Sequence, residues 1–271
     1  MTADYLSLSY WDVALAALFL LLNAGLSIRL RLGLAQQIGV AAGRMVVQLL
    51  LVGLVLKAIF AAGSPWLTAG VALLMVGFAA REGWARQERR LAGPWGWGLG
   101  GGAIAFAGSL VIVVGLAALI RPEPWWSPRF ALPLFGMILG NALTGVSLAL
   151  DSLSTTLDRE RRSVEAQLLL GATRWQAVRP VTRRALRSGM MPIINAMAAT
   201  GVVALPGMMT GQIVSGVDPT EAVKYQLLIM FLIAGATACG VLLAVLGGVR
   251  RLTDRRHRLR LDRLRPPKRE S

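Results

Sequence analysis

Seven long apolar segments, separated by shorter polar stretches, constrain the fold of this chain more than any other feature of its sequence. A helix that crosses the hydrocarbon core of a bilayer needs about 20 mostly apolar residues. The segments that approach this requirement are 10–28, 38–61, 65–80, 97–120, 130–150, 190–211 and 223–249. The third segment is short, and the residues that interrupt the sixth are Pro192, Gly201, Pro206 and Gly207. The pattern predicts an all-α polytopic membrane protein with about seven transmembrane helices.

The composition also favours a membrane location over a soluble fold. Hydrophobic residues make up 55% of the chain and charged residues 16%, whereas an average soluble domain carries roughly 25% charged residues. The formal net charge is nevertheless +15, from 29 Lys and Arg against 14 Asp and Glu. Such a charge can indicate nucleic-acid binding when it forms one face of a soluble fold. A membrane protein with one basic side explains both properties, and no nucleic-acid partner is expected.

The basic residues are distributed unequally between the two sets of loops. One set holds two, four, eight and ten Lys and Arg in the segments 29–37, 81–96, 151–189 and 250–271, which is 24 of the 29. The loops of the other set hold only Arg121 and Arg129. Because positively charged loops remain in the cytoplasm, we expect the N-terminus outside and the C-terminus in the cytoplasm. This orientation needs an odd number of spans, as seven provides, in a multi-pass protein of the inner (plasma) membrane.

The rare residue types exclude several kinds of functional site. The chain has one cysteine, Cys239, and one histidine, His257. A Cys/His zinc site needs about four such ligands, and an internal disulfide needs two cysteines. A Ser/His/Asp site within the membrane would need a histidine there, and His257 lies in an arginine-rich tail. None of the three lysines follows the phosphate-binding GxxxxGK[ST] pattern, so we expect no catalytic residue and no ATP hydrolysis by this chain.

The longest internal polar stretch, 151–189, has the residue spacing of an amphipathic helical hairpin. The apolar residues that can share one face of it are Leu168, Leu169, Ala172 and Trp175. Gly171 interrupts the helical pattern and permits a helix–turn–helix corner, because glycine readily adopts left-handed backbone angles. Such a hairpin on the cytoplasmic side either lies on lipid or is bound by a soluble partner.

A short motif in this hairpin resembles the coupling motif of ABC transporter permeases. Glu165 and Ala166, followed after four residues by Gly171, match the first half of that motif. The second half would need an apolar pair and a proline, and the chain instead has the run 181–184, Val-Thr-Arg-Arg, which departs from the importer pattern. In such permeases a short helix fits a groove on the ATP-binding subunit. The resemblance assigns ATPase coupling to Glu165, Ala166, Gly171, Ala172 and Trp175.

The sequence beyond this motif resembles a narrower group, the FetB/YbbM-type permeases, most strongly over residues 160–240. The most specific match is 205–212, LPGMMTGQ. Bacterial members of this group are associated with iron export, and the plant aluminium-sensitivity membrane proteins belong to it. The resemblance implies a permease domain over 1–250, with its coupling segment at 151–189. The basic tail over 251–271 repeats arginine with interleaved leucine, which favours a segment that lies on anionic lipid over one that binds RNA.

The same resemblance implies the partners of the chain. A separate ATP-binding cassette subunit would carry ATP and Mg, and this chain would bind no cofactor itself. Because a seven-span chain without internal duplication supplies one coupling helix, two copies would pair with two ATPases in a 2+2 complex. The implied cargo is iron in bacteria, and a nucleotide sugar or a metal-related solute in plants.

Polar and soft residues within the apolar segments suggest a transport pathway, because polar groups inside a membrane are costly and often functional. Pro206 removes a helix hydrogen bond, and broken helices in membranes occur where they line a cavity or pack against protein. Methionine thioethers are soft ligands that suit Cu(I) better than Fe(III). The predicted pathway residues are Asn141, Asn195, Pro206, Met208, Met209, Thr210 and Gln212. The alternatives are interhelical hydrogen bonds for the asparagines and core packing for the methionines.

Other functions fit the sequence less well than an ABC permease does. A transporter driven by an ion gradient would need buried carboxylates, and no Asp or Glu lies deep in a predicted span. An intramembrane protease would need a Ser/His or Asp pair within the membrane, which is absent. Three alternatives remain: an ABC permease for a non-metal solute such as a nucleotide sugar, a transporter driven by an ion gradient with no ATPase, and a scaffold that senses stress through an ATPase. The residues of any metal site are not indicated.

Overall fold

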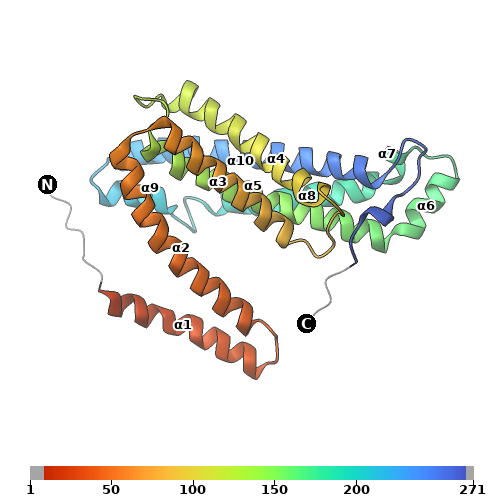
Figure 1. Ribbon diagram of the computed structural model, residues 1–271, viewed down its shortest axis with the longest axis horizontal. Coiled ribbons are helices and arrows are strands. Elements are labelled where there is room, and N and C mark those ends of the chain that lie inside the picture. The colour runs from red at the N-terminus through yellow and green to blue at the C-terminus, as the bar shows by residue number, and fades with distance from the viewer. Residues whose placement is uncertain (1–8, 267–271) are drawn as a thin grey trace. The chain divides into compact units, whose positions relative to one another are not determined.

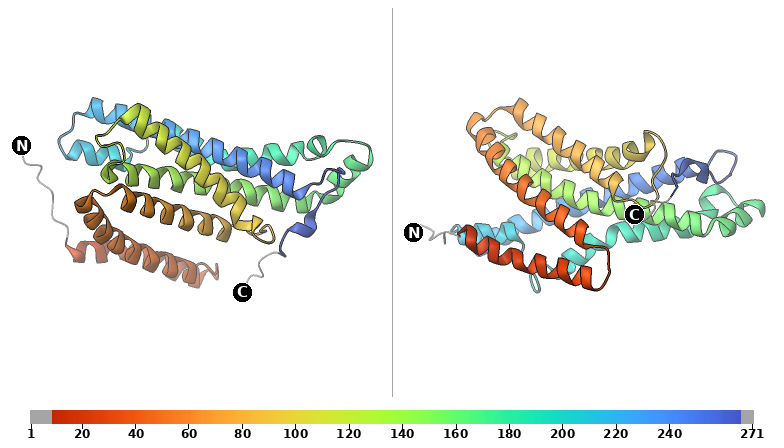
Figure 2. Two further views of the ribbon diagram at one scale, coloured as in Figure 1. Left: turned by 45° about the horizontal axis from the view of Figure 1, so that its top comes forward. Right: turned by 60° about the horizontal axis from the view of Figure 1, so that its bottom comes forward.

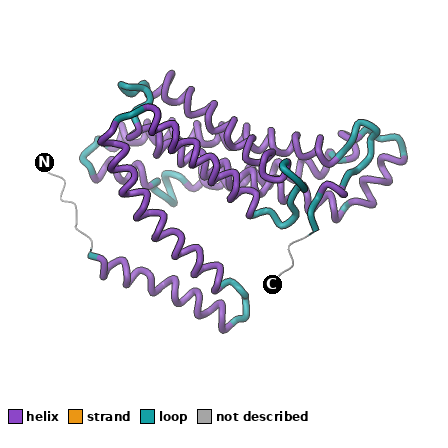
Figure 3. The backbone as a smooth tube through the Cα atoms, viewed as in Figure 1, coloured by secondary structure: helices purple, strands orange, loops and turns teal. Residues whose placement is uncertain are grey.

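The computed structural model describes residues 9–266, and helices form nearly all of its regular structure. The described residues contain no strand, only three isolated bridges, which confirms the predicted all-α class. Figure 3 shows that loops occupy little more than the connections between helices. Contacts divide the chain into two compact units, unit 1 over Met1–Gly63 and unit 2 over Ser64–Ser271.

Unit 1 is a helical hairpin made of α1 (Tyr10–Arg29) and α2 (Ala35–Ala62). Ser9 caps α1, since its hydroxyl accepts from the Trp11 amide and its own amide donates to the Asp12 carboxylate at 2.8 Å. Gly63 ends α2 with a left-handed φ of 56°. Only 6% of the most apolar window of each helix is buried. Both helices therefore expose the apolar surface that a bilayer would cover.

Unit 2 contains the remaining helices and the tail. Its helices are α3 (Pro65–Ala85), α4 (Trp95–Val114), α5 (Pro128–Arg159), α6 (Arg161–Leu169), α7 (Arg174–Ala177), α8 (Arg179–Ala199), α9 (Gly207–Val214) and α10 (Pro219–Leu252). A π-helical turn, Gly115–Ile120, extends α4, and a 3-10 turn, Leu261–Arg263, lies in the tail. Helices α3, α5 and α10 begin at a proline, which is tolerated there because the first helical N–H groups have no partner within the helix.

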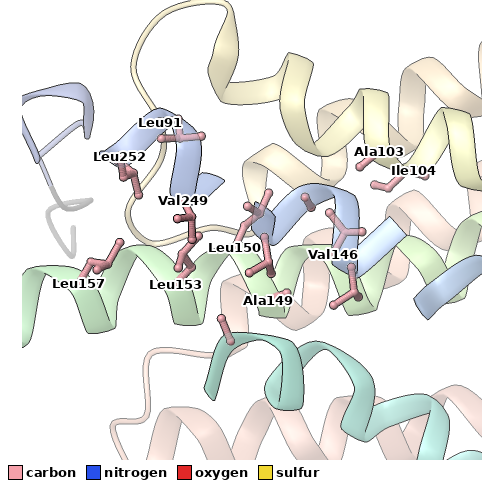
Figure 4. Packing of buried hydrophobic residues seen from close by; sticks show 14 of the residues in the cluster. Leu91, Ala103, Ile104, Val146, Ala149, Leu150, Leu153, Leu157, Val249 and Leu252 are labelled. Carbon is pink, nitrogen blue, oxygen red and sulfur yellow. The ribbon is translucent and has the colours of Figure 1, made fainter. Parts of the chain in front are cut away.

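The core of unit 2 lies where α4, α5, α8 and α10 pack along one another (Figures 1 and 2). Leu153 and Leu157 of α5 lie close to Val249 and Leu252 of α10, and each is at most 1% exposed (Figure 4). A second apolar cluster, which includes Ile138, continues the core toward α9. The burial leaves little free space between α5 and α10, so these two helices form the rigid centre of the unit.

Helices α5 and α8 approach most closely at two glycines, beside α10. A Cβ atom placed on Gly189 of α8 would lie 2.7 Å from the Gly145 carbonyl oxygen and 3.0 Å from Val241. A Cβ atom on Gly145 of α5 would lie 2.8 Å from both the Gly189 carbonyl oxygen and the Thr237 methyl group. Small residues permit such close contacts in membrane helices. We call this contact the glycine crossing.

The structure contains fewer long apolar helices than the sequence predicts. Among the described residues, five helices are long and apolar enough to cross a membrane, namely α1, α2, α4 with its π-helical extension, α5 and α10. The predicted segment 65–80 lies in α3, which is not among these five. The predicted segment 190–211 is divided, because α8 ends at Ala199 and α9 begins at Gly207. A count of seven spans and the orientation of the chain remain predictions.

The structure differs from the predicted helix boundaries at two places, within the sixth segment, 190–211, and in the polar stretch that precedes it. Pro192 does not interrupt the chain but lies inside α8, whereas Gly201, with a φ of 94°, and Pro206 lie in the break. The predicted hairpin at 151–189 is also shorter in the structure, because both ends of this polar stretch belong to long helices. Helix α5 continues to Arg159 and α8 begins at Arg179, since packing against α10 supports both helices beyond their apolar parts.

Candidate functional site

The predicted coupling segment forms a sharp corner between α6 and α7. Gly171 has a φ of 87°, a left-handed angle that favours glycine. The Gly171 amide donates to the Leu168 carbonyl at 3.1 Å, and the Ala172 amide donates to the Gln167 carbonyl at 3.0 Å. Thr173 then caps α7 in a capping box with Gln176. These bonds fix the direction in which the chain turns, as the sequence predicts.

The five predicted coupling residues all lie in α6, the corner or α7. Glu165 forms an ion pair with Arg161 of its own helix, with Nε and Oε1 2.8 Å apart. Ala166 is exposed on α6, whereas Ala172 is half-buried against the core of unit 2. Trp175 is exposed, and the Arg174 guanidinium lies 5.6 Å from its ring centroid. The structure places these residues together, but it does not test their role.

The prediction of one shared apolar face for this hairpin is wrong. Leu168 and Ala172 pack against the core, whereas Leu169 and its neighbour Leu170 are each 88% exposed. Leu168 and Leu169 are successive helical residues, which are rotated by about 100° from each other, so Leu168 faces the core while Leu169 faces away from it. The run Leu-Leu-Leu-Gly at 168–171 is the sequence feature that could have indicated the exposed pair, Leu169 and Leu170. Leu170 is therefore a candidate coupling residue that sequence reasoning missed.

The arginine-rich tail packs against the corner. The Arg174 amide donates to Nδ1 of His257 at 3.0 Å, and the Arg174 guanidinium donates to the Asp254 carbonyl at 3.4 Å. The Asp254 carboxylate in turn accepts from the amides of Arg256 and Arg258, both at 2.9 Å. Hydrogen bonds from the Arg258 backbone amide and side chain hold the pKa of Asp254 below its usual value. The tail thus forms an ordered turn at the start of α7.

Further along, the tail pairs with the α3–α4 connection. The Ala92 amide donates to the Arg263 carbonyl at 2.7 Å, and the Arg265 amide donates to the Arg90 carbonyl at 2.8 Å. Leu264 is buried against this connection, where it forms an isolated bridge. A tail that simply lies on lipid does not account for these contacts. The described part of the tail, up to residue 266, ties the α3–α4 connection to α7.

We expect His257→Ala to loosen the start of α7 without unfolding unit 2. The substitution removes the acceptor for the Arg174 amide, and an intramolecular hydrogen bond contributes about 1 kcal/mol. Hydrogen exchange of the amides in 173–178 should become about fivefold faster. The control is Arg256→Ala, since the Arg256 amide rather than its side chain bonds Asp254. Equal exchange in both variants would show that His257 does not hold the corner.

The predicted pathway residues lie on α5, α8 and α9. Asn141 is half-buried and donates to the Met137 carbonyl of its own helix at 2.9 Å. Asn195 is exposed on α8, four residues before the helix ends at Ala199 and the break in the sixth segment begins. Both asparagines lie beyond the glycine crossing as seen from the corner, toward α9. The remaining predicted residues lie at the N-cap of α9 or within this helix and are Pro206, Met208, Met209, Thr210 and Gln212.

Helix α9 begins at the break, and its polar side chains are bonded unequally. Pro206 caps it with extended backbone, and its carbonyl accepts from the Thr210 hydroxyl at 3.1 Å. Gln212 has a buried Oε1 atom with no hydrogen-bond partner among the described residues. Met208 is exposed and Met209 is half-buried. A buried amide oxygen without a partner is unusual and suggests a group that this chain does not supply.

No cluster of three or more His, Cys, Asp or Glu residues capable of holding a metal occurs within residues 9–266. The soft or neutral donors at α9 are the thioethers of Met208 and Met209 and the amide oxygen of Gln212. These donors are few and uncharged, whereas tight metal sites in proteins use several charged or imidazole ligands.

One helix connects the corner to the break. Helix α8 begins at Arg179, directly after α7, and ends at Ala199 before the break. Its 21 residues give a length of about 30 Å, and Figure 1 shows α7 and α9 at opposite ends of unit 2. The glycine crossing lies midway along α8, at Gly189. Helix α8 therefore links the corner to the break that precedes α9.

Comparison with known proteins gives the family of the chain. Residues 10–253 match a family model described as "Uncharacterised protein family (UPF0014)". A UPF0014 membrane protein of Synechocystis sp. is 38% identical over 205 residues, which cover 74% of this chain and 77% of that protein. FetB of Escherichia coli, described as a probable iron export permease protein, is 32% identical over 260 residues, or 93% and 95% of the two chains.

A plant protein is also similar. The Arabidopsis thaliana protein ALUMINUM SENSITIVE 3 is 32% identical over 224 residues, which cover 82% of this chain and 80% of that protein. No solved structure matches the chain. These matches cover nearly the whole described range and confirm the resemblance to FetB-type and plant aluminium-sensitivity proteins. The chain therefore belongs to the UPF0014 family of membrane proteins, and its relatives include a protein described as a probable iron export permease.

Proposed function

We propose that the chain is the membrane-spanning permease subunit of an ABC transporter that exports iron or a related metal or solute. ATP and Mg would bind a separate ATP-binding cassette subunit. The observation that carries the proposal is the corner between α6 and α7, where Leu169 and Leu170 are each 88% exposed on a hydrogen-bonded turn. An exposed apolar pair next to charged residues suits the groove of a protein partner.

In the proposed membrane orientation, the N-terminus lies outside and this corner lies in the cytoplasm. The basis is the charge distribution, because 24 of the 29 Lys and Arg residues lie in segments that would share one side of the membrane. The permease domain would comprise 1–250, with the basic tail over 251–271, in an inner (plasma) membrane. Exposed arginines on the helices that flank the corner, such as Arg162 of α6 and Arg183 of α8, would orient an acidic partner surface.

Each chain presents one corner, so we infer a 2+2 complex with two permease copies and two ATPases. Closed twofold assemblies are common for such subunits. ATP binding would bring the ATPases together and move the corner. Helix α8 would transmit this movement past the glycine crossing to α9, where the access to the cargo pathway would change.

The cargo is proposed from the relative and from the donors near α9. FetB of Escherichia coli is described as a probable iron export permease protein. The donors are the Oε1 atom of Gln212, which has no hydrogen-bond partner among the described residues, and the thioether of Met209, which is half-buried; both would lie on the proposed pathway. Neutral donors of this kind allow a cation to pass without being trapped.

The experiment reconstitutes the chain with its ATP-binding subunit in liposomes that contain an iron-sensitive dye. We expect Fe²⁺ to raise the ATPase rate severalfold and ATP to drive iron across the membrane, with no transport when either subunit is omitted. Zn²⁺ and a nucleotide sugar serve as alternative cargoes. Stimulation by the nucleotide sugar but not by Fe²⁺ would contradict metal export, and failure of the two subunits to associate would contradict the ABC permease role.

A further inference from the structure

A continuous groove follows one side of α3 and ends at the tail. It consists of two shallow hollows, open to the surface and of about 480 and 350 Å³, that share Gly77 and Arg81; residues of α3 alone line the second. The residues that line the first cavity are Gly77, Arg81, Trp84, Gly93, Pro94, Trp97 and Arg265. The residues that line the second are Gly70, Leu73, Leu74, Gly77, Phe78 and Arg81. We call these residues together the α3 groove.

One end of the α3 groove is cationic. Arg81 and Arg265 line the first cavity, and no Asp or Glu lines it. No described residue forms a hydrogen bond or an ion pair with the Arg81 guanidinium. The Arg265 guanidinium lies 5.5 Å from the centroid of the Trp84 ring, and its backbone amide donates to the Arg90 carbonyl at 2.8 Å. The cavity thus holds two positive groups, one from a helix and one from the folded tail, without a counter-charge among its lining residues.

The other end of the α3 groove is apolar and open. Leu73, Leu74 and Phe78 are 72%, 63% and 63% exposed. Nothing lies within 4 Å of a Cβ atom placed on Gly70 or Gly77, so both glycines leave open space. Positions 70, 74, 77, 81 and 84 recur every three or four residues and therefore share one helix face. Along this face the lining changes from apolar side chains to arginine and tryptophan. These two residue types are typical of the level where the hydrocarbon core of a bilayer meets the headgroups.

We propose that the α3 groove binds one anionic phospholipid. Its phosphate would lie between the guanidinium groups of Arg81 and Arg265, which form strong charge-assisted hydrogen bonds with phosphate oxygens. One acyl chain would follow Leu73, Leu74 and Phe78 past the space left by Gly77. The apolar half of the groove distinguishes this ligand from free phosphate, and the unpaired positive charge distinguishes it from a zwitterionic lipid.

The bound lipid would also join two parts of the protein. Arg81 belongs to α3, and Arg265 belongs to the tail, whose residue His257 accepts from the Arg174 amide at the start of α7. A phosphate held by both arginines would fasten the tail at one end while His257 fastens it at the other. The lipid composition of the membrane would then influence how firmly the tail holds α7.

The test measures lipid retention by the full chain, purified in a mild detergent, with native mass spectrometry. The probes are dioleoyl-phosphatidylglycerol, dioleoyl-phosphatidylcholine and inorganic phosphate. We expect the wild type to retain one phosphatidylglycerol in preference to phosphatidylcholine. Arg81→Gln and Arg265→Gln should each weaken phosphatidylglycerol binding by about fivefold, and inorganic phosphate should not displace the lipid.

Two further variants separate the site from general charge effects. Gly77→Leu fills the middle of the groove without changing the charge, and we expect it to lower phosphatidylglycerol binding as much as the arginine substitutions do. Arg256→Gln makes the same charge change as Arg265→Gln within the tail and lies outside the groove, so binding should remain at the wild-type level. Thermal unfolding of each variant establishes that it is folded.

Several results would overturn the proposal. Equal retention of phosphatidylglycerol by the wild type and by folded Arg81→Gln and Arg265→Gln proteins would remove the arginines from the site. Displacement by inorganic phosphate would indicate a soluble anion as the ligand. A change of oligomeric state in Gly77→Leu, without a change in lipid binding, would indicate that a second copy of the chain covers the groove.

Discussion

Replacing Leu169 and Leu170 together by aspartate is expected to abolish binding of the ATP-binding subunit while the permease remains folded. Each leucine is 88% exposed in the chain alone, so the change removes little packing within unit 2. In the proposed complex both side chains would be buried, and burial of a leucine contributes about 1.5–3 kcal/mol. Loss of both contacts, with carboxylates placed in an apolar groove, should weaken binding by at least about 100-fold.

The measurement is co-purification of the two subunits, followed by a titration of the ATPase onto the permease in detergent. The matched control is Val202→Asp with Val203→Asp, since these residues are 93% and 82% exposed at the other end of α8. This control makes the same charge change and should leave binding of the ATPase unchanged. Normal binding by the leucine variant, or equal losses in both variants, would contradict the assignment of the corner as the coupling site.

Replacing Gly189 by leucine is expected to prevent stable folding of unit 2. Even the Cβ atom of an alanine would lie 2.7 Å from the Gly145 carbonyl oxygen, which belongs to the backbone of α5 and cannot rotate away. Helices α5 and α8 would have to separate, and overpacking of this kind costs about 1–3 kcal/mol for small additions. We expect Gly189→Ala to lower the midpoint of thermal unfolding by several degrees and Gly189→Leu to leave little protein in the folded fraction.

Gly235 of α10 provides the control, because nothing lies within 4 Å of a Cβ atom placed there. Gly235→Ala should be neutral or slightly stabilising, since alanine favours helix by up to about 1 kcal/mol over glycine. Size-exclusion chromatography with tryptophan fluorescence, after heating at a series of temperatures, gives the unfolding midpoint of each variant. A Gly189→Ala protein as stable as the wild type would show that α5 and α8 can separate easily, and the glycine crossing would then not support a rigid α8.

The apolar runs of the sequence predicted most of the long helices. A run of about 20 apolar residues has to bond its own backbone groups inside a membrane, and a helix does this without any help from other segments. The runs 10–28, 38–61, 97–120, 130–150 and 223–249 accordingly lie in five helices of sufficient length. The left-handed turn at Gly171 was predictable for a similar reason, because it depends on local backbone freedom.

The helix ends were less predictable, because packing decides them. Helix α5 continues for nine residues past the predicted end of its apolar run, to Arg159. Its polar end is supported from outside, as Ser154 donates to the Arg89 carbonyl at 2.9 Å and Asp158 pairs with the Arg89 guanidinium at 3.0 Å. No local pattern in 151–159 indicates that residue 89 lies nearby.

The features of the candidate site also fall into two groups, those that the sequence predicts and those that depend on tertiary packing. The sequence by itself determined the apolar helices, the glycine turn and the position of the corner between α6 and α7, since each depends on residues that are close together in the chain. Only the tertiary structure decided that Leu170 is exposed beside Leu169, that His257 accepts from the Arg174 amide, and that Gly145 meets Gly189. These features join residues up to 83 positions apart, and side-chain contacts at such separations follow from the packing of whole helices rather than from any local pattern.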